Sequence, residues 1–116
     1  MTVFNWREYF ALAQDLSKKN DEASLRSSVS RAYYAVFCIA RNYALTKGHK
    51  ISRSARAHQE VEKLYSGQLS IPTVSTNLDR LRFARNKCDY EDGVSSLQNI
   101  VKLSLLQAEK VLRLIP

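Results

Sequence analysis

The sequence is poor in the residues that interrupt secondary structure. Glycine and proline supply only 3 and 2 of its 116 residues. This scarcity, with an apolar content of 45%, excludes collagen-like, low-complexity and disordered chains. No apolar run approaches the ~20 residues that a membrane-spanning helix needs, so we expect no membrane segment.

Ligand-binding motifs are also scarce. Cys38 and Cys88 form no CxxC pair, and together with His49 and His58 they are scattered along the chain, whereas zinc needs about four ligands at short spacing. No glycine-rich loop precedes a helix, so the common phosphate-binding loops are missing. The first residues lack the basic-then-apolar order of a signal peptide. We therefore expect a cytoplasmic protein without a metal or a cofactor.

The length permits one domain, which we expect to span residues 1–116. A chain of this size buries roughly two thirds of its unfolded surface on folding. It therefore needs neither a disulfide nor a metal to be stable.

The charge is unbalanced and unevenly distributed. Lys and Arg number 18 against 11 Asp and Glu, which gives a net charge of +7. No acidic residue occurs from Ala23 to Gln59, a stretch that holds Arg26, Arg31, Arg41, Lys47, Lys50, Arg53 and Arg56. Such a surface attracts RNA, DNA, nucleotides or an acidic protein. The alternative is a solvated basic face that only keeps the protein soluble.

Helical periodicity dominates the chain, and strand patterns are nearly absent. Five helices are expected, at about 5–19, 22–47, 54–65, 75–88 and 95–114. Asn5, Asp21 and Ser75 are the expected caps, Ser95 and Gln98 form a capping box, and residues 89–93 interrupt the chain. The third helix has few apolar residues and is expected on the outside. The pattern predicts an all-α, up-and-down bundle of four long helices plus one short helix.

The second expected helix has two stripes. Its apolar residues follow an alternating spacing of four and three that marks the centre of a bundle: Leu25, Val29, Ala32, Val36, Ile39 and Tyr43. A more polar stripe beside it contains Arg31, Tyr34, Cys38 and Arg41. Tyr33 and Tyr34 either stack on a base or belong to the core with a satisfied hydroxyl.

Arg85 and His58 are the remaining candidates. Arg85 shares a stripe with Leu78 and Leu81, where a cation needs a carboxylate or a phosphate beside it. That partner is either Asp89, one helical turn later, or an anionic ligand. His58 is either an ordinary surface residue or takes part directly.

Two segments resemble a known family. Residues 30–37, Ser-Arg-Ala-Tyr-Tyr-Ala-Val-Phe, are similar to the second-helix signature of small bacterial and archaeal HEPN-domain proteins. Residues 85–90, Arg-Asn-Lys-Cys-Asp-Tyr, resemble their Arg-Asn-x-x-Asp-Tyr signature, and His58 lies where this subgroup often has a histidine. The resemblance spans about residues 5–112. It implies a helical bundle that commonly dimerises, often beside a small nucleotidyltransferase in toxin–antitoxin or phage-defence pairs.

Active members of that family are metal-independent ribonucleases with an Arg followed four to six residues later by His. Here Tyr90 follows Arg85 after four intervening residues, and no histidine follows Arg85. Cleavage through the ribose 2′-hydroxyl needs a proton acceptor that titrates near neutral pH. Tyrosine, with a pKa of about 10, is a poor base at pH 7. The departure weakens the ribonuclease interpretation more than the binding one.

Three functions remain. The first is a non-catalytic or weakly catalytic HEPN-like module of a toxin–antitoxin or phage-defence type system that binds RNA, a nucleotide or a partner. Its candidate binding residues are Arg31, Tyr34, Arg41, Lys50, Arg53, Arg56, His58 and Asn86. The second is an endoribonuclease in which Arg85 holds the phosphate and Tyr90, Asp89 or His58 replaces the missing base. The third is a helical protein-interaction subunit. The expected partners are a second copy of the chain and a nucleotidyltransferase or antitoxin.

Overall fold

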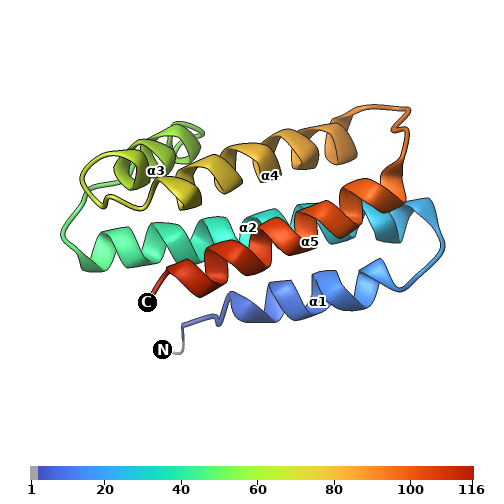
Figure 1. Cartoon of the computed structure of the whole chain (residues 1–116), viewed down its shortest axis with the longest axis horizontal. Coiled ribbons are helices and arrows are strands. Elements are labelled where there is room, and N and C mark those ends of the chain that lie inside the picture. The colour runs from blue at the N-terminus through green and yellow to red at the C-terminus, as the bar shows by residue number, and fades with distance from the viewer. Residues whose placement is uncertain (1–2) are drawn as a thin grey trace.

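The structure, a computed structural model, describes residues 3–116; Met1 and Thr2, the start of the expected domain, lie outside them. Within that range it is entirely helical and has no strand. The helices are α1 (Arg7–Ser17), α2 (Glu22–Thr46), α3 (Ala57–Ser66), α4 (Pro72–Tyr90) and α5 (Leu97–Leu114). Figure 1 shows α1, α2, α4 and α5 running alternately in opposite directions, with the short α3 beside the start of α4. The expected all-α fold is confirmed.

Helix α2 is the centre of the bundle. It contacts each of the other four helices, and 12 of its 25 residues are buried. Its start is capped by Asp21, whose carboxylate accepts a hydrogen bond from the Ser24 N–H at 2.9 Å. Its end is followed by Gly48, whose φ of 88° is a left-handed conformation that glycine adopts without strain. The apolar stripe expected on this helix is therefore the main core-forming surface.

Helix α4 differs from its expected range at both ends. It begins at Pro72, three residues before the expected cap Ser75, because proline lacks an N–H and suits the first turn. It continues through Tyr90, so the expected interruption at residue 89 does not occur. Arg85, Asp89 and Tyr90 consequently lie on one continuous helix, about one turn apart.

Two further details differ from expectation. The capping box of Ser95 and Gln98 does not form: α5 is preceded by Ser96 in a left-handed conformation (φ 57°), and its side chain makes no capping hydrogen bond. Helix α3 was expected on the outside, yet its Val61 and Tyr65 are fully buried. The Tyr65 hydroxyl donates to the Ala40 carbonyl at 2.7 Å, which attaches α3 to α2. A short helix with few apolar residues still contributes to the core because its apolar residues share one face.

Two negative observations bear on function. In residues 3–116 no helix combines the length and the apolarity needed to cross a bilayer. In the same residues no three side chains of His, Cys, Asp or Glu lie together as metal ligands would.

Candidate functional site

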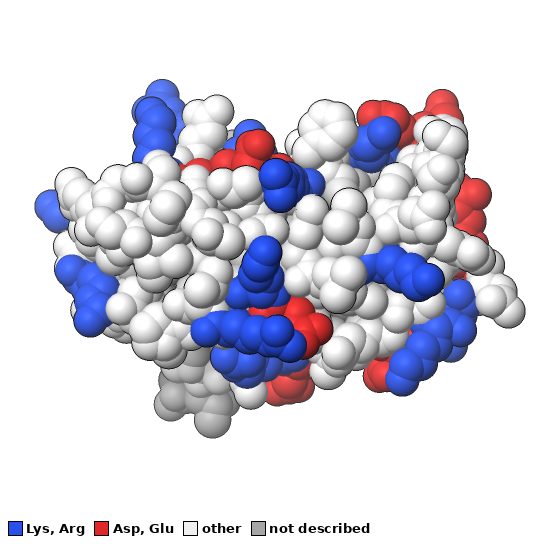
Figure 2. All heavy atoms as spheres, in the orientation of Figure 1, with Lys and Arg blue, Asp and Glu red and all other residues white. Residues whose placement is uncertain are grey.

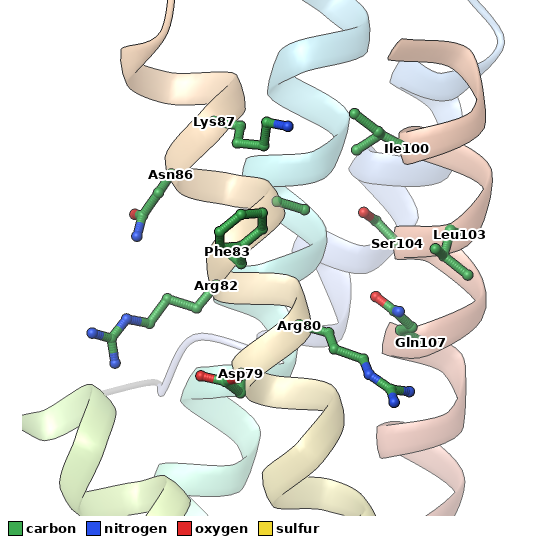
Figure 3. Close-up of a pocket in the computed structure, with 11 residues that line it drawn as sticks. Asp79, Arg80, Arg82, Phe83, Asn86, Lys87, Ile100, Leu103, Ser104 and Gln107 are labelled. Atoms are coloured by element: carbon green, nitrogen blue, oxygen red, sulfur yellow. The ribbon is translucent and has the colours of Figure 1, made fainter. Parts of the chain in front are cut away.

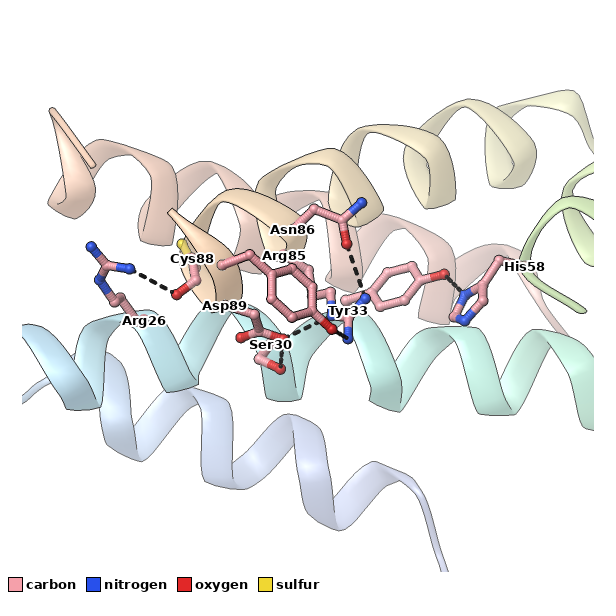
Figure 4. A network of polar contacts seen from close by, with 9 residues as sticks. Arg26, Ser30, Tyr33, His58, Arg85, Asn86, Cys88 and Asp89 are labelled. Carbon is pink, nitrogen blue, oxygen red and sulfur yellow. Dashed lines mark hydrogen bonds and ion pairs between the residues drawn. The ribbon is translucent and has the colours of Figure 1, made fainter. Parts of the chain in front are cut away.

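Arg85 is held by a ring of partners on its own helix. Its Nε donates to Asp89 Oδ2 at 2.8 Å, and its terminal nitrogens donate to Asn86 Oδ1 at 2.9 Å and to the Tyr90 hydroxyl at 3.2 Å (Figure 4). Asp89 lies four positions after Arg85 and therefore on the same face of the helix, and the long arginine side chain also reaches Asn86 and Tyr90. Of the two alternatives for the partner of Arg85, the pair with Asp89 is thus formed.

Helix α2 completes this site from the opposite side. The Ser30 hydroxyl donates to Asp89 Oδ2 at 3.2 Å. The guanidinium carbon of Arg85 lies 5.0 Å from the ring centre of Tyr34 and 5.3 Å from that of Tyr90, within cation–π range. We call Arg85 and these neighbours the arginine centre; they are Ser30, Tyr34, Asn86, Asp89 and Tyr90.

The arginine centre keeps its cation charged and still able to donate. Burial alone lowers the pKa of Arg85, but Tyr34, Tyr90 and Asp89 together raise it above its usual value. A guanidinium has five N–H donors, and three are used within the centre. Two N–H groups therefore have no acceptor among residues 3–116. This geometry suits an oxyanion such as a phosphodiester, since the guanidinium is already oriented and only partly exposed, at 15% for its side chain.

His58 lies beside the arginine centre but is committed to the core. Its Nδ1 is hydrogen-bonded to the Tyr33 hydroxyl (Figure 4). Its ring stacks on Phe37 with the centroids 4.5 Å apart. Burial, followed by the positive charges of Arg82 and Arg85, lowers the pKa of His58 below its usual value. The imidazole is therefore neutral at pH 7.

The Tyr33 hydroxyl also determines which imidazole nitrogen holds the proton. Burial raises the pKa of Tyr33 well above its usual value, so the phenol keeps its proton. His58 Nδ1 is its only hydrogen-bond partner in residues 3–116. The phenol donates to Nδ1, which leaves the imidazole proton on Nε2. His58 thus presents a donor, not a free base.

The other two candidates for the missing base are occupied as well. Tyr90 is 72% exposed, and its hydroxyl oxygen accepts a hydrogen bond from Arg85. The Oδ2 of Asp89 accepts from both Arg85 and Ser30. The arrangement is therefore better suited to holding an anion than to removing a proton.

The remaining basic candidates are distributed along the molecule. Arg31 lies next to the arginine centre, with its guanidinium carbon 6.0 Å from the Tyr34 ring centre. Arg41 is held farther along α2, where its Nε donates to Asn42 Oδ1 at 3.1 Å. The exposed residues of the loop after α2 lie at the other end of that helix: Lys50, Arg53 and Arg56. Figure 2 shows Lys and Arg side chains spread over one face, not gathered in a single patch.

Sequence reasoning missed two residues that position the site. Arg26 donates to the carbonyl oxygen of Cys88 at 3.1 Å (Figure 4). It also donates to the carbonyl oxygens of Asp92, at 2.9 Å, and of Glu91. It thereby satisfies carbonyls left free at the end of α4. Ser30 holds Asp89 from α2. Ser30 was visible within the Ser-Arg-Ala-Tyr-Tyr-Ala signature, whereas nothing in the sequence pairs Arg26 with residues more than sixty positions away.

A groove between α4 and α5 was also not expected. It has a volume of about 660 Å³, and its apolar side chains include Phe83, which is 68% exposed, and Leu103, which is 55% exposed. Figure 3 shows Arg80 and Lys87 among the residues that surround it. Contiguous exposed apolar side chains of this kind mark interaction surfaces in general.

Comparison with known proteins agrees with the geometry. The family model described as HEPN domain matches residues 7–116. Searches of curated proteins and of solved structures gave no match. The family match includes all five helices, the Ser30–Phe37 and Arg85–Tyr90 signatures and His58. The chain therefore belongs to the HEPN domain family.

Proposed function

We propose that this protein is an RNA- or nucleotide-binding HEPN module with little or no catalytic activity, acting in a toxin–antitoxin or phage-defence type system. Family membership supports a nucleotide- or RNA-related module. One observation carries the proposal: in a protein of net charge +7, the Arg85 guanidinium is held in place, charged, and has two N–H groups without an acceptor in residues 3–116. A preorganised cation of this kind binds phosphate with little loss of side-chain entropy.

The weak-catalysis part rests on the proton acceptors. Tyr90 takes the place of the family's histidine, His58 presents an N–H, and Asp89 is bound by two donors. General-base catalysis is worth about 10²–10⁴-fold. Loss of the general base leaves phosphate binding intact but removes most of the rate of RNA cleavage.

We further propose a homodimer built around α4. On this helix Arg80 and Arg82 precede Arg85 and Asp89 follows it, and Asp92 lies two residues beyond the end of the helix. Two α4 helices that cross antiparallel near Arg85 place the basic part of one copy beside the acidic part of the other. The contact is isologous and covers the exposed Phe83 and Tyr90 side chains. Family members often dimerise or bind partners.

The dimer is tested by light scattering at micromolar concentration. The unaltered protein is expected at twice its 13.3 kDa chain mass. Phe83→Ser should shift it toward the monomer, while Leu12→Ser, which removes an exposed leucine from α1, should not. A 13 kDa monomer for the unaltered protein contradicts the proposal.

A nucleotidyltransferase or antitoxin is the proposed protein partner, by analogy with the family. Cys38 and Cys88 are both free and buried, in keeping with the reducing cytoplasm proposed for the protein.

The function is tested by fluorescence anisotropy with labelled single-stranded RNA at low salt. Binding should weaken about tenfold or more in Arg85→Gln, since a charge-assisted hydrogen bond contributes about 1.5–3 kcal/mol. The matched control is Arg113→Gln on α5, whose arginine is 76% exposed and forms an ion pair one turn away with Glu109. Circular dichroism of each variant separates lost binding from lost folding.

The outcomes distinguish the three functions. Metal-free RNA cleavage by the unaltered protein, lost in Arg85→Ala and in Tyr90→Phe, would establish an endoribonuclease instead. The observation that favours this alternative is the hydrogen bond between Tyr90 and Arg85. RNA and nucleotide binding that is undetectable at low salt would leave the protein-interaction subunit, for which the α4–α5 groove is the surface.

A further inference from the structure

The groove between α4 and α5 extends farther than the hollow described above. A second hollow of about 410 Å³ lies next to it, farther along α5. The two hollows share Arg80, Leu103 and Gln107, so they form one channel, which we call the long groove. On α5 it extends from Ile100 to Arg113, which is about 20 Å at a helical rise of ~1.5 Å per residue. A partner helix of about 13 residues has this length.

Exposed apolar side chains line the long groove. Leu106 is 65% exposed and Leu103 is 55% exposed, and they lie three positions apart on one face of α5. Phe83 borders the same space from α4. Neighbouring exposed apolar side chains mark a surface that another molecule covers. A hollow between two helices suits a third helix, whose apolar side chains repeat every three or four residues.

The rim of the long groove is basic. Arg80, Lys87 and Lys110 line it, and none of the three is in an ion pair within residues 3–116. In Figure 3, Arg80 and Lys87 extend from α4 toward α5, whereas Arg82 points the other way. Arg82 pairs there with Glu62 of α3 at 3.2 Å. The unpaired cations therefore lie where the acidic side chains of a partner can reach them.

The acidic residues of the lining, Asp79 and Glu109, do not offset these cations. Glu109 is already paired with Arg113 at 2.6 Å. Asp79 lies beside Glu62: burial, followed by the charge of Asp79, raises the pKa of Glu62. The charge that the long groove presents to a partner is therefore positive.

We propose that the long groove binds an acidic amphipathic helix of a protein partner. The apolar face of that helix packs against Leu103 and Leu106, and its carboxylates pair with Arg80, Lys87 and Lys110. The inference rests on the proposed function, which includes a protein partner, and deepens it by giving the binding surface and the chemistry of the bound segment.

Two other occupants fit the long groove less well. A second copy of the chain, in an isologous contact, places the same unpaired cations opposite each other, and like charges across an interface oppose association. An anionic membrane also attracts a basic and apolar surface. A flat bilayer, however, contacts side chains that protrude, whereas the hollow between α4 and α5 is concave.

The test is fluorescence anisotropy with the full chain and three labelled peptides of about 14 residues. The first peptide has leucines at helical spacing and glutamate and alanine elsewhere. The second has lysine in place of glutamate, and the third has the composition of the first with its leucines spread around the helix. The first peptide is expected to bind in the micromolar range, and the other two at least about tenfold more weakly.

Variants of the chain locate the binding. Leu106→Ser should weaken binding of the acidic peptide about tenfold or more, because that is the contribution of one buried leucine. Leu106 is chosen since Phe83 belongs to the proposed dimer contact. The matched control is Leu12→Ser on α1, whose leucine is exposed and lies outside the long groove. Circular dichroism checks that each variant is folded.

The charge contribution is tested with a second pair of variants. Arg80→Gln should weaken binding of the acidic peptide about threefold and reduce its salt dependence, as expected for an ion pair near the surface. The control is Arg7→Gln, which removes an exposed arginine from α1.

Three results would overturn the inference: no binding of the acidic peptide at hundreds of micromolar, equal binding of the glutamate and lysine peptides, or equal losses in Leu106→Ser and Leu12→Ser. A dimer that Leu106→Ser converts to a monomer would assign the long groove to a second copy instead. Binding to phosphatidylserine vesicles that depends on Leu106, without binding of the acidic peptide, would assign it to a membrane.

The same variants separate this inference from the proposed function. Arg85→Gln should weaken RNA binding without changing peptide binding. Absent peptide binding with intact, Arg85-dependent RNA binding would refute the long groove alone. Intact peptide binding without RNA binding would refute the role of Arg85 alone.

Discussion

The interaction of Arg26 with the end of α4 gives a quantitative prediction. Its side chain is 18% exposed and donates to the carbonyls of Cys88, Glu91 and Asp92, besides its ion pair with Glu22. Arg26→Met keeps the aliphatic stem and removes all of these hydrogen bonds. The variant isolates what the guanidinium contributes to the last turn of α4.

The magnitude follows from the number of contacts. We take about 1 kcal/mol for each hydrogen bond to a carbonyl, because the partly exposed end of α4 can regain hydrogen bonds to water in the variant. The three hydrogen bonds then contribute about 3 kcal/mol. The exposed pair with Glu22 adds only about 0.3–0.5 kcal/mol. For a chain of this size, 1 kcal/mol corresponds to about 4 °C in Tm. We therefore expect Arg26→Met to lower Tm by about 12 °C.

The assay is thermal and urea denaturation followed by circular dichroism. The control is Arg113→Met. Arg113 is paired one turn away with Glu109, and within residues 3–116 it donates to no carbonyl of another helix. It should cost less than about 1 kcal/mol. Similar losses of stability in the two variants would refute the reasoning, because the three carbonyl contacts would then contribute nothing. RNA binding should also weaken in Arg26→Met, since Asp89 and Tyr90 lie in the turn that Arg26 holds.

Three further predictions test the site. Tyr90→His places a histidine after Arg85 with four residues between them, and it should raise metal-free RNA cleavage by about 10²-fold or more. Arg85→Gln in the same variant should abolish the gain. A folded but inactive Tyr90→His variant would show that more than a base is missing. The lowered pKa of His58 means that the unfolded chain takes up its proton first as pH falls. The free energy of unfolding should therefore drop as pH decreases below about 6.5, and His58→Gln should remove that part of the slope in urea titrations at several pH values. Neutralising Arg41, Lys50, Arg53 and Arg56 together should flatten the salt dependence of RNA binding, because fewer counterions are released. An unchanged slope would exclude residues 41–56 from the RNA interface.

Local sequence was enough to predict the all-helical fold. The alternating apolar spacing of residues 25–43 identified the central helix, whose Val29, Ala32 and Val36 are fully buried. Asp21 and Gly48 marked its ends correctly. These features depend on backbone conformation and on residues within a few positions of each other, so they can be read from the sequence. The pair of Arg85 and Asp89 is equally local, being one turn apart.

The tertiary structure decided how those helices work together. The hydrogen bond from Tyr33 that makes His58 a donor joins α2 to α3, and the contacts of Ser30 and Arg26 with the end of α4 join residues about sixty positions apart. A pocket lined by Arg41, Ile51 and His58 likewise exists only where the loop between α2 and α3 folds beside α2. Periodicity shows which face of a helix is apolar, but not its rotation, tilt or axial shift against its neighbours. Those are set by the packing of all side chains at once, which is why the site could be located on its helices from sequence but its chemistry could not.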